Sequence, residues 1–187
     1  MLIINTLLKE ENQMALVFLS LGSNKGDRLS QIQQAVNFLT ADNSIKLVAS
    51  SAFYETEPWG NKKQFWFVNA VIAIRTELQP VELLRVCQSI EAKLGRDRAL
   101  EEKWGERPID IDILFYDNLI LKNEILEIPH KHVQDRAFAL VPMLEIAPNY
   151  VHPVLNKSIL DLHDALEDPE DVFLYGTIIS ENDYEKN

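Results

Sequence analysis

The chain has 187 residues, of which 47% are hydrophobic and 25% are charged, a composition typical of a globular protein with one sizeable core. Its net charge of −11 argues against a general nucleic-acid-binding surface, and no apolar run reaches the roughly 18 residues of a membrane-spanning helix. The single cysteine, Cys87, excludes an intramolecular disulfide framework. These features lead us to expect a cytoplasmic protein that binds neither nucleic acid nor membranes.

The first part of the chain begins with strand and helix patterns. Residues 1–13 precede the first of these patterns and are expected to form an N-terminal extension. Residues 15–21 form an apolar run that predicts a strand buried on both faces, and residues 28–40 place apolar side chains on one face of a helix. The turn between them, residues 22–28, lacks the full Walker pattern of a phosphate-binding loop, so we interpret it as a turn that caps the helix.

Two further strands are predicted, at residues 45–54 and 65–75, on either side of a loop punctuated by Pro and Gly. Asn69 lies within the second of these strands, where an amide side chain is unfavourable. Asn69 is either a structural amide with satisfied hydrogen bonds or a group that recognises a ligand by hydrogen bonds to the ligand's edge. A helix then begins at Pro80, and Glu91, near the end of that helix, is expected to be exposed.

The stretch from residue 95 to residue 115 carries the most informative pattern. At its end, isoleucines alternate with Asp110 and Asp112, which predicts a strand with both carboxylates on one face, roughly 6.5 Å apart. Paired carboxylates suit Mg²⁺, which usually keeps several waters and takes one or two protein carboxylates plus substrate phosphates. The alternative interpretation of this pair is the solvated outer face of an antiparallel strand.

A basic loop precedes this strand, although the chain as a whole has 29 acidic residues against 18 Lys and Arg. Cations beside a carboxylate pair suit a polyphosphate, because the cations neutralise phosphate oxygens and the carboxylates hold the bridging metal. Since the loop is polar and bounded by glycines, we expect a lid in which Arg96 has no fixed position before ligands arrive, whereas Arg107 is better fixed. The basic cluster surrounds Trp104 and consists of Arg96, Arg98, Lys103 and Arg107.

The rest of the chain is predicted to hold a short strand at residues 119–121, helices at 133–145 and 158–166, and an acidic tail at 167–187. His130 and His132 precede the first of these helices, and without other soft ligands nearby a histidine that donates to a phosphate is more credible there than a zinc site. The order strand, helix, strand, strand, helix, strand predicts a ferredoxin-like α+β fold, an antiparallel sheet with helices on one face. We place this fold in a single domain, residues 14–166.

Several short motifs in this order give the chain a resemblance to a known family. They include Leu21-Gly22-Ser23-Asn24, Phe67-Val68-Asn69-Ala70, Gly95-Arg96-Asp97-Arg98, Arg107-Pro108-Ile109-Asp110-Ile111-Asp112 and Arg136-Ala137-Phe138. Over residues 15–166 the chain resembles the 6-hydroxymethyl-7,8-dihydropterin pyrophosphokinases of folate biosynthesis, and its spacing Arg-x-x-Asp-x-Asp is the most specific mark. The resemblance implies a monomeric enzyme with two Mg²⁺ ions that transfers pyrophosphate from its co-substrate ATP to the hydroxymethyl group of the pterin and releases AMP.

The resemblance also implies roles for individual residues. The implied catalytic groups are Arg96, Arg107, Asp110 and Asp112, with Asp110 and Asp112 as the metal ligands. The implied ATP contacts are Glu91, Arg98, Lys103, Arg107, Ile113, His130 and Arg136. The implied pterin pocket consists of Thr56, Trp59, Phe67, Asn69, Trp104 and Phe138. These residue types suit the ligand, because a flat heteroaromatic ring favours aromatic faces to stack on and an amide at its edge.

The chain departs from the family pattern at three positions. Lys103 stands where many members have Arg, Glu106 where Pro is usual, and Phe67 where Tyr is frequent. Two rival functions remain. A ferredoxin-like module that binds a nucleotide or RNA without chemistry is disfavoured by the Asp pair and the acidic charge. Another Mg²⁺-dependent phosphotransferase, acting on a different hydroxyl substrate, is disfavoured only by the residues of the pterin pocket.

Overall fold

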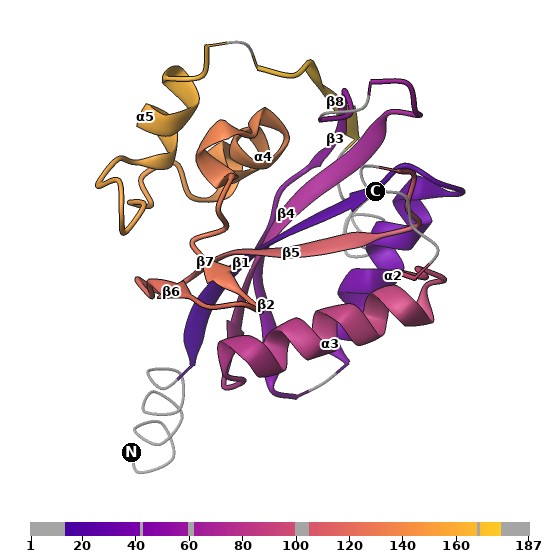
Figure 1. The fold of residues 1–187 in the computed structure, drawn as a ribbon, viewed down its shortest axis with the longest axis horizontal. Coiled ribbons are helices and arrows are strands. Elements are labelled where there is room, and N and C mark those ends of the chain that lie inside the picture. The colour runs from indigo at the N-terminus through magenta and orange to yellow at the C-terminus, as the bar shows by residue number, and fades with distance from the viewer. Residues whose placement is uncertain (1–13, 42, 60–61, 100–104, 168, 177–187) are drawn as a thin grey trace, which may run out of the picture.

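The computed structural model describes residues 14–176 apart from 42, 60–61, 100–104 and 168. At its centre lies a six-stranded sheet in the order β5-β1-β4-β3-β8, with β2 also beside β4 (Figure 1). All of these pairs are antiparallel. The strands of this sheet are β1 (Ala15–Ser23), β2 (Ile45–Ser50), β3 (Phe53–Thr56), β4 (Phe67–Thr76), β5 (Asp110–Tyr116) and β8 (Val172–Gly176). A separate hairpin is formed by β6 (Leu121–Lys122) and β7 (Glu127–Ile128).

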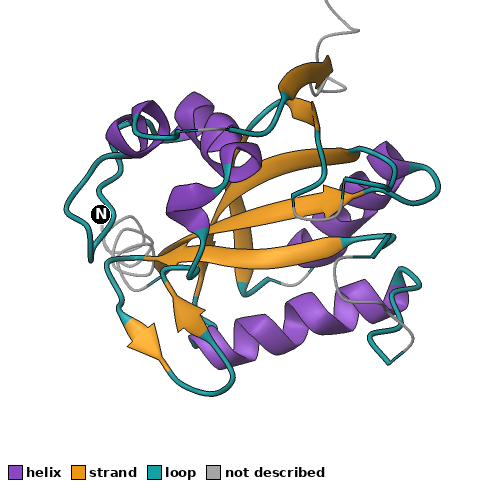
Figure 2. Ribbon diagram, turned by 45° about the horizontal axis from the view of Figure 1, so that its top comes forward, coloured by secondary structure: helices purple, strands orange, loops and turns teal. Residues whose placement is uncertain are grey.

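Helices cover both faces of the sheet, as Figures 1 and 2 show. On one face, α2 (Arg28–Thr40) and α3 (Pro80–Lys93) enclose a buried cluster with Leu19 and Leu21 of β1. On the other face, Phe18 and Phe115 pack with the short helix η1 (Val133–Asp135), α4 (Ala137–Ile146) and α5 (Ile159–Asp164). The prediction of helices on one face was therefore incomplete. A strand that is apolar on both faces, such as β1, needs a layer of helices on each side.

The order and pairing of the elements confirm the ferredoxin-like fold. The helix predicted at residues 28–40 forms with those bounds, and the side chain of Asp27 caps it by accepting a hydrogen bond from Ser30 N at 3.1 Å. The strand predicted at residues 45–54 is instead divided into β2 and β3 at Ser51. The Oγ of Ser51 accepts a hydrogen bond from Val71 N at 3.0 Å. At this point a side chain therefore takes the place of a backbone carbonyl in the hydrogen bonding of the sheet.

The chain returns to the sheet near its C-terminus. Val172–Gly176, which lie within the predicted acidic tail, form β8 and pair with β3, with Val172 opposite Thr56 and Leu174 opposite Tyr54. This edge strand extends the sheet beyond the predicted pattern of elements. Across the residues that the structure describes, no helix is both long and apolar enough to cross a membrane.

Candidate active site

Asp110 and Asp112 extend from the same face of β5 into one pocket. In the pairing of β5 with β1, Asp110 lies opposite Gly22 and Asp112 lies opposite Ser20. The isoleucines that alternate with the two acids are buried in the cluster that contains α3. The predicted placement of both carboxylates on one strand face is therefore confirmed, and they line a pocket rather than an open outer surface.

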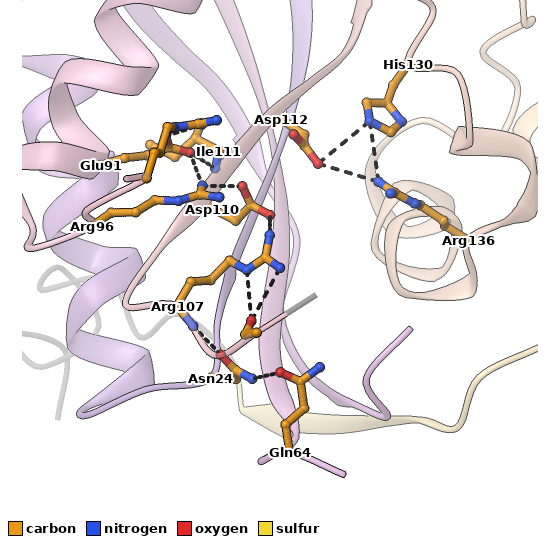
Figure 3. A network of polar contacts seen from close by, with 12 residues as sticks. Asn24, Gln64, Glu91, Arg96, Arg107, Asp110, Ile111, Asp112, His130 and Arg136 are labelled. Carbon is orange, nitrogen blue, oxygen red and sulfur yellow. Dashed lines mark hydrogen bonds and ion pairs between the residues drawn. The ribbon is translucent and has the colours of Figure 1, made fainter. Parts of the chain in front are cut away.

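Two arginines hold Asp110, one at each carboxylate oxygen (Figure 3). Arg96 Nη1 lies 2.5 Å from Oδ1, and Arg107 Nη1 lies 2.8 Å from Oδ2. Burial alone would raise the pKa of Asp110, but these guanidinium groups outweigh it and hold the pKa below its usual range. Asp110 is therefore ionised at neutral pH and fixed in place by the protein itself.

Glu91 is buried, with only 1% of its side chain accessible, although we expected an exposed residue. Its Oε1 accepts hydrogen bonds from Arg96 Nη1 at 2.7 Å and Ile111 N at 2.8 Å, and its Oε2 accepts one from Arg98 Nη2 at 2.5 Å. These donors compensate the burial of the carboxylate. The expectation was wrong because helical periodicity does not reveal that the end of α3 meets β5. The same contacts bury the side chain of Arg96, which we expected to have no fixed position.

Arg107 is fixed by Asn24, a residue that belonged to a family motif but had no predicted role. Arg107 N donates to Asn24 Oδ1 at 2.8 Å, and Asn24 N donates to Arg107 O at 3.2 Å. Asn24 Nδ2 donates in turn to Gln64 Oε1 at 3.0 Å (Figure 3) and to Phe65 O at 3.1 Å. One buried amide thus joins the end of β1 to two loops and fixes the backbone of Arg107. The expected contrast with Arg96 is not seen, because the side chain of Arg96 is 5% exposed and that of Arg107 is 18% exposed. The signal in the sequence was an Asn directly after a buried strand.

Asp112 has looser contacts than Asp110. Its Oδ2 lies 3.5 Å from Arg136 Nη1 and 3.9 Å from His130 Nε2 (Figure 3). Burial and the neighbouring charge of Asp110 raise the pKa of Asp112 to about 7. Burial and the charge of Arg136 lower the pKa of His130 to about 3, so its ring is neutral at physiological pH. The carboxylate of Asp112 therefore lines the pocket with Arg136 as a cationic partner, at a longer distance than the two arginines that bind Asp110.

The pocket beside the two carboxylates combines aromatic and polar walls. It contains about 570 Å³ of empty space, its open mouth included. The guanidinium of Arg136 lies 5.0 Å from the ring centre of Trp59 and 5.3 Å from that of Phe138. Residues of the predicted pterin site that line this pocket are Thr56, Trp59, Phe67, Asn69 and Phe138. Lining residues without a predicted role are Ser20, Gly22, Glu57 and Gln64.

Asn69 is a buried residue that lines this pocket, and its Nδ2 donates to Thr56 Oγ1 at 2.7 Å. Gly22 lies opposite Asn69 in the pairing of β1 with β4, and a Cβ at position 22 would lie only 2.3 Å from Asn69 Oδ1. The amide therefore fits in this place only above a glycine. The Nδ2 of Asn69 has a structural partner in Thr56. A hydrogen bond from Asn69 to the edge of a bound ligand stays a prediction.

Some residues with implied roles lie away from this pocket. Ile113 is 3% exposed and belongs to the hydrophobic core on the α2 and α3 side of the sheet. Arg98 is about half exposed and, with Glu91 and Arg96, lines a second hollow at the end of α3. Lys103 and Trp104 lie outside the described residues. Their implied contacts with ATP and pterin therefore stay predictions.

Comparison with known sequences gives a consistent result. The family model for 7,8-dihydro-6-hydroxymethylpterin-pyrophosphokinase (HPPK) matches residues 18–148. A 2-amino-4-hydroxy-6-hydroxymethyldihydropteridine pyrophosphokinase from Methylorubrum extorquens is 51% identical over 138 residues, which cover 74% of this chain and 86% of the relative. A protein of the same name from Aquifex aeolicus is 40% identical over 146 residues, which cover 78% of this chain and 89% of the relative.

Among solved structures, wild-type Plasmodium falciparum HPPK-DHPS with pterin and p-hydroxybenzoate has a similar fold. The TM-score is 0.63 and the sequence identity is 20%, over 86% of this chain. The matched part is 44% of that longer chain, so the present chain corresponds to less than half of its length. At this level of identity the similarity concerns the fold.

Proposed function

The chain belongs to the 7,8-dihydro-6-hydroxymethylpterin-pyrophosphokinase family, and we propose that the pocket beside Asp110 and Asp112 is where it transfers the pyrophosphoryl group of ATP to 6-hydroxymethyl-7,8-dihydropterin. In this reaction of folate synthesis, the hydroxymethyl group of the pterin releases its hydroxyl proton, and its oxygen forms a bond to the β-phosphorus of ATP. The bond between that phosphorus and the oxygen that bridges to the α-phosphate breaks, and AMP leaves. The other product is the pterin diphosphate.

One observation carries this proposal: an aromatic cavity with a buried amide and a carboxylate pair are parts of the same pocket. Phe67 and Phe138 offer faces for a flat ring, and Asn69 lines the same pocket, with Gly22 between it and Asp110 in the sheet. A pterin held by these groups would have its hydroxymethyl group in the cavity that Asp110 and Asp112 line. This arrangement favours phosphoryl chemistry on a pterin over a module that only binds nucleotides.

Arg96 and Arg107 are proposed to stabilise the negative charge of the polyphosphate during transfer. Each is held by a contact outside the pocket, Arg96 by Glu91 and Arg107 by Asn24. Donors that are fixed in advance need not be reorganised when charge develops in the transition state, which is the main source of their catalytic effect. Arg136, which lies beside Asp112 and over Phe138, is proposed as a further phosphate contact.

Asp110 and Asp112 are proposed to bind Mg²⁺. Within the described residues, no group of three or more His, Cys, Asp and Glu side chains could hold a metal ion by itself. Two carboxylates beside a ligand pocket nevertheless fit Mg²⁺, which commonly completes its shell with water and substrate phosphates. When bound, Mg²⁺ would neutralise phosphate charge and polarise the group being transferred. The number of ions, the monomeric state and the cytoplasmic location stay predictions.

The test is to incubate the purified protein with ATP, Mg²⁺ and 6-hydroxymethyl-7,8-dihydropterin and to separate the nucleotide products by chromatography. We expect AMP, formed in a one-to-one ratio with pterin diphosphate and only when the pterin is present. ADP would instead identify a different phosphotransferase, and nucleotide binding without turnover would identify a binding module. The matched control is 6-methyl-7,8-dihydropterin, which lacks the reacting hydroxyl and should yield no AMP.

A further inference from the structure

The segment of residues 170–176, which ends in β8, lies beyond the residues matched by the family model, yet it contacts the candidate active site. Its backbone is fixed next to the pocket wall, because Glu57 N donates to Asp171 O at 3.0 Å and Val172 pairs with Thr56. Phe173 stacks on Trp66 with ring centres 5.9 Å apart. These contacts hold the segment against β3, at the side of the pocket that Thr56 and Glu57 line.

Glu170, in this segment, bonds to the start of α4. Its Oε2 accepts a hydrogen bond at 3.0 Å from the backbone N of Ala137, the first residue of that helix. Arg136 is the residue directly before Ala137, and its carbonyl oxygen accepts the bond of Leu140 N at 3.0 Å. A carboxylate at this place satisfies an amide that has no partner within the helix and lies at the favourable end of the helix dipole. It therefore fixes the backbone from which the Arg136 side chain extends.

The side chains of Arg136 and Glu170 also have complementary polar atoms, a donor on Arg136 and an acceptor on Glu170. Among the described residues, Arg136 Nε and Glu170 Oε1 are both buried without a hydrogen-bond partner. Arg136 is 8% exposed, and its Nη1 faces Asp112 in the pocket. Burial lowers the pKa of Arg136, and the charges of Asp112, Asp110 and Glu170 oppose this effect. Glu170 is thus a negative charge that acts on Arg136 from outside the pocket.

We propose that Glu170 is a positioning residue for Arg136: it fixes the start of α4 and supplies a counter-charge, so that the guanidinium is held toward the phosphates of ATP. The proposal rests on the proposed function, in which Arg136 contacts the polyphosphate. Residues that orient a functional group from outside the site commonly change affinity or activity by about 10- to 100-fold when they are removed. The C-terminal segment would then be part of the working enzyme and not only an appendage.

The test is a double-mutant cycle between Glu170 and Arg136, read by calorimetric titration of the full chain with a non-hydrolysable ATP analogue and Mg²⁺. Glu170→Ala should weaken analogue binding by about tenfold, and Glu170→Gln, which keeps an acceptor for Ala137 N but loses the charge, by less. In an Arg136→Ala background neither change should have a further effect. Pterin affinity should change by less than about twofold in Glu170→Gln.

The matched control is Asp171→Asn, which removes an exposed carboxylate from the next position and should leave analogue binding unchanged. If the losses from Glu170→Ala and Arg136→Ala add, or if ATP-analogue and pterin affinities fall together, the residue acts through general stability and the proposal is overturned. If Glu170→Ala does not fold, the same double-mutant cycle is measured with Glu170→Gln and Arg136→Ala. The binding cycle does not depend on turnover, so a protein that forms no AMP would contradict the proposed function while still testing the coupling.

Discussion

Gly22 lies directly opposite Asn69, and the distance from Asn69 Oδ1 to a Cβ added at Gly22 would be only 2.3 Å. On its other side, Gly22 lies opposite Asp110 in the pairing of β1 with β5. A single glycine therefore separates the amide expected to bind the pterin from a carboxylate expected to bind the metal. The absence of a side chain at this point lets Asn69 reach Thr56 and leaves the pocket open between β4 and β5.

Gly22→Ala is expected to weaken pterin binding by about 5- to 150-fold, because displacement of a buried amide from its hydrogen bond costs about 1–3 kcal/mol. Binding of an ATP analogue should change much less, since the atoms nearest to the added Cβ belong to Asn69 and Phe67, which are implied pterin contacts. Calorimetric titration with each ligand separates the two effects. Gly176→Ala is the matched control in a strand, because its added Cβ meets nothing within 4 Å. Unchanged pterin affinity in Gly22→Ala would show that Asn69 has no part in binding.

Asp110→Asn and Asp112→Asn should both lower turnover by at least about 100-fold but should differ in stability. Asp110 bonds closely to Arg96 and Arg107, so its change leaves two partly buried cations with a weakened partner and should cost about 1–3 kcal/mol of unfolding free energy. Asp112 has longer ion-pair distances, 3.5 Å and 3.9 Å, and its pKa is raised to about 7, so its ionised form is unfavourable in the folded protein and the neutral Asn should not lower stability at pH 7. Urea unfolding without ligands measures this difference, and equal losses would contradict the geometry described here.

Glu91→Ala should be among the most destabilising single changes near the site. It removes the carboxylate that binds Arg96, Arg98 and the backbone of Ile111, and it leaves a buried guanidinium short of a partner, at a cost of about 3–5 kcal/mol. Glu124→Ala, in an exposed position, is the matched control and should be near neutral. Chemical denaturation of both variants provides the measurement. A near-neutral Glu91→Ala would mean that the arginines are held by other groups.

Cys87 should be unreactive in the folded protein. Its side chain is fully buried in the core on the α3 side of the sheet, and burial, with the charges of Glu91 and Asp112, raises its pKa to about 12. The thiol therefore stays protonated and inaccessible from pH 7 to pH 10, and iodoacetamide labelling followed by mass spectrometry should detect almost no product. The same protein in denaturant should label fully, as a control. Rapid labelling of the native protein at pH 8 would show that this part of the core opens readily.

Much of the fold could be predicted because local pattern and tertiary structure agree. The apolar face of residues 28–40 and the run at residues 15–21 indicate α2 and β1 without any knowledge of their neighbours. The alternation around Asp110 and Asp112 likewise places both acids on one face of a strand. Which face of the sheet a helix covers, however, depends on how several elements pack together. The cover over the second face of the sheet, formed by α4 and α5, could be inferred only by asking what buries the other side of β1.

The parts of the site that sequence reasoning missed are held by contacts between distant residues. Asn24 fixes Arg107 across 83 positions of the chain, and Glu170 bonds to Ala137 across 33 positions. Glu91 has the helical spacing of a surface residue, and only the approach of β5 explains its burial. No local periodicity carries such information, because each contact depends on how two loops or an element and a loop meet in three dimensions.

The central claim is that the β-phosphorus of ATP is attacked by the pterin hydroxyl in the pocket beside Asp110 and Asp112. The most direct measurement is to supply ATP labelled with ³²P in the β-phosphate, together with Mg²⁺ and 6-hydroxymethyl-7,8-dihydropterin, and to follow the label. The account predicts that the label moves into the pterin product with unlabelled AMP as the nucleotide product, and that Asp112→Asn abolishes this transfer in a folded protein. Label found in ADP, or transfer that persists at a normal rate in Asp112→Asn, would contradict it.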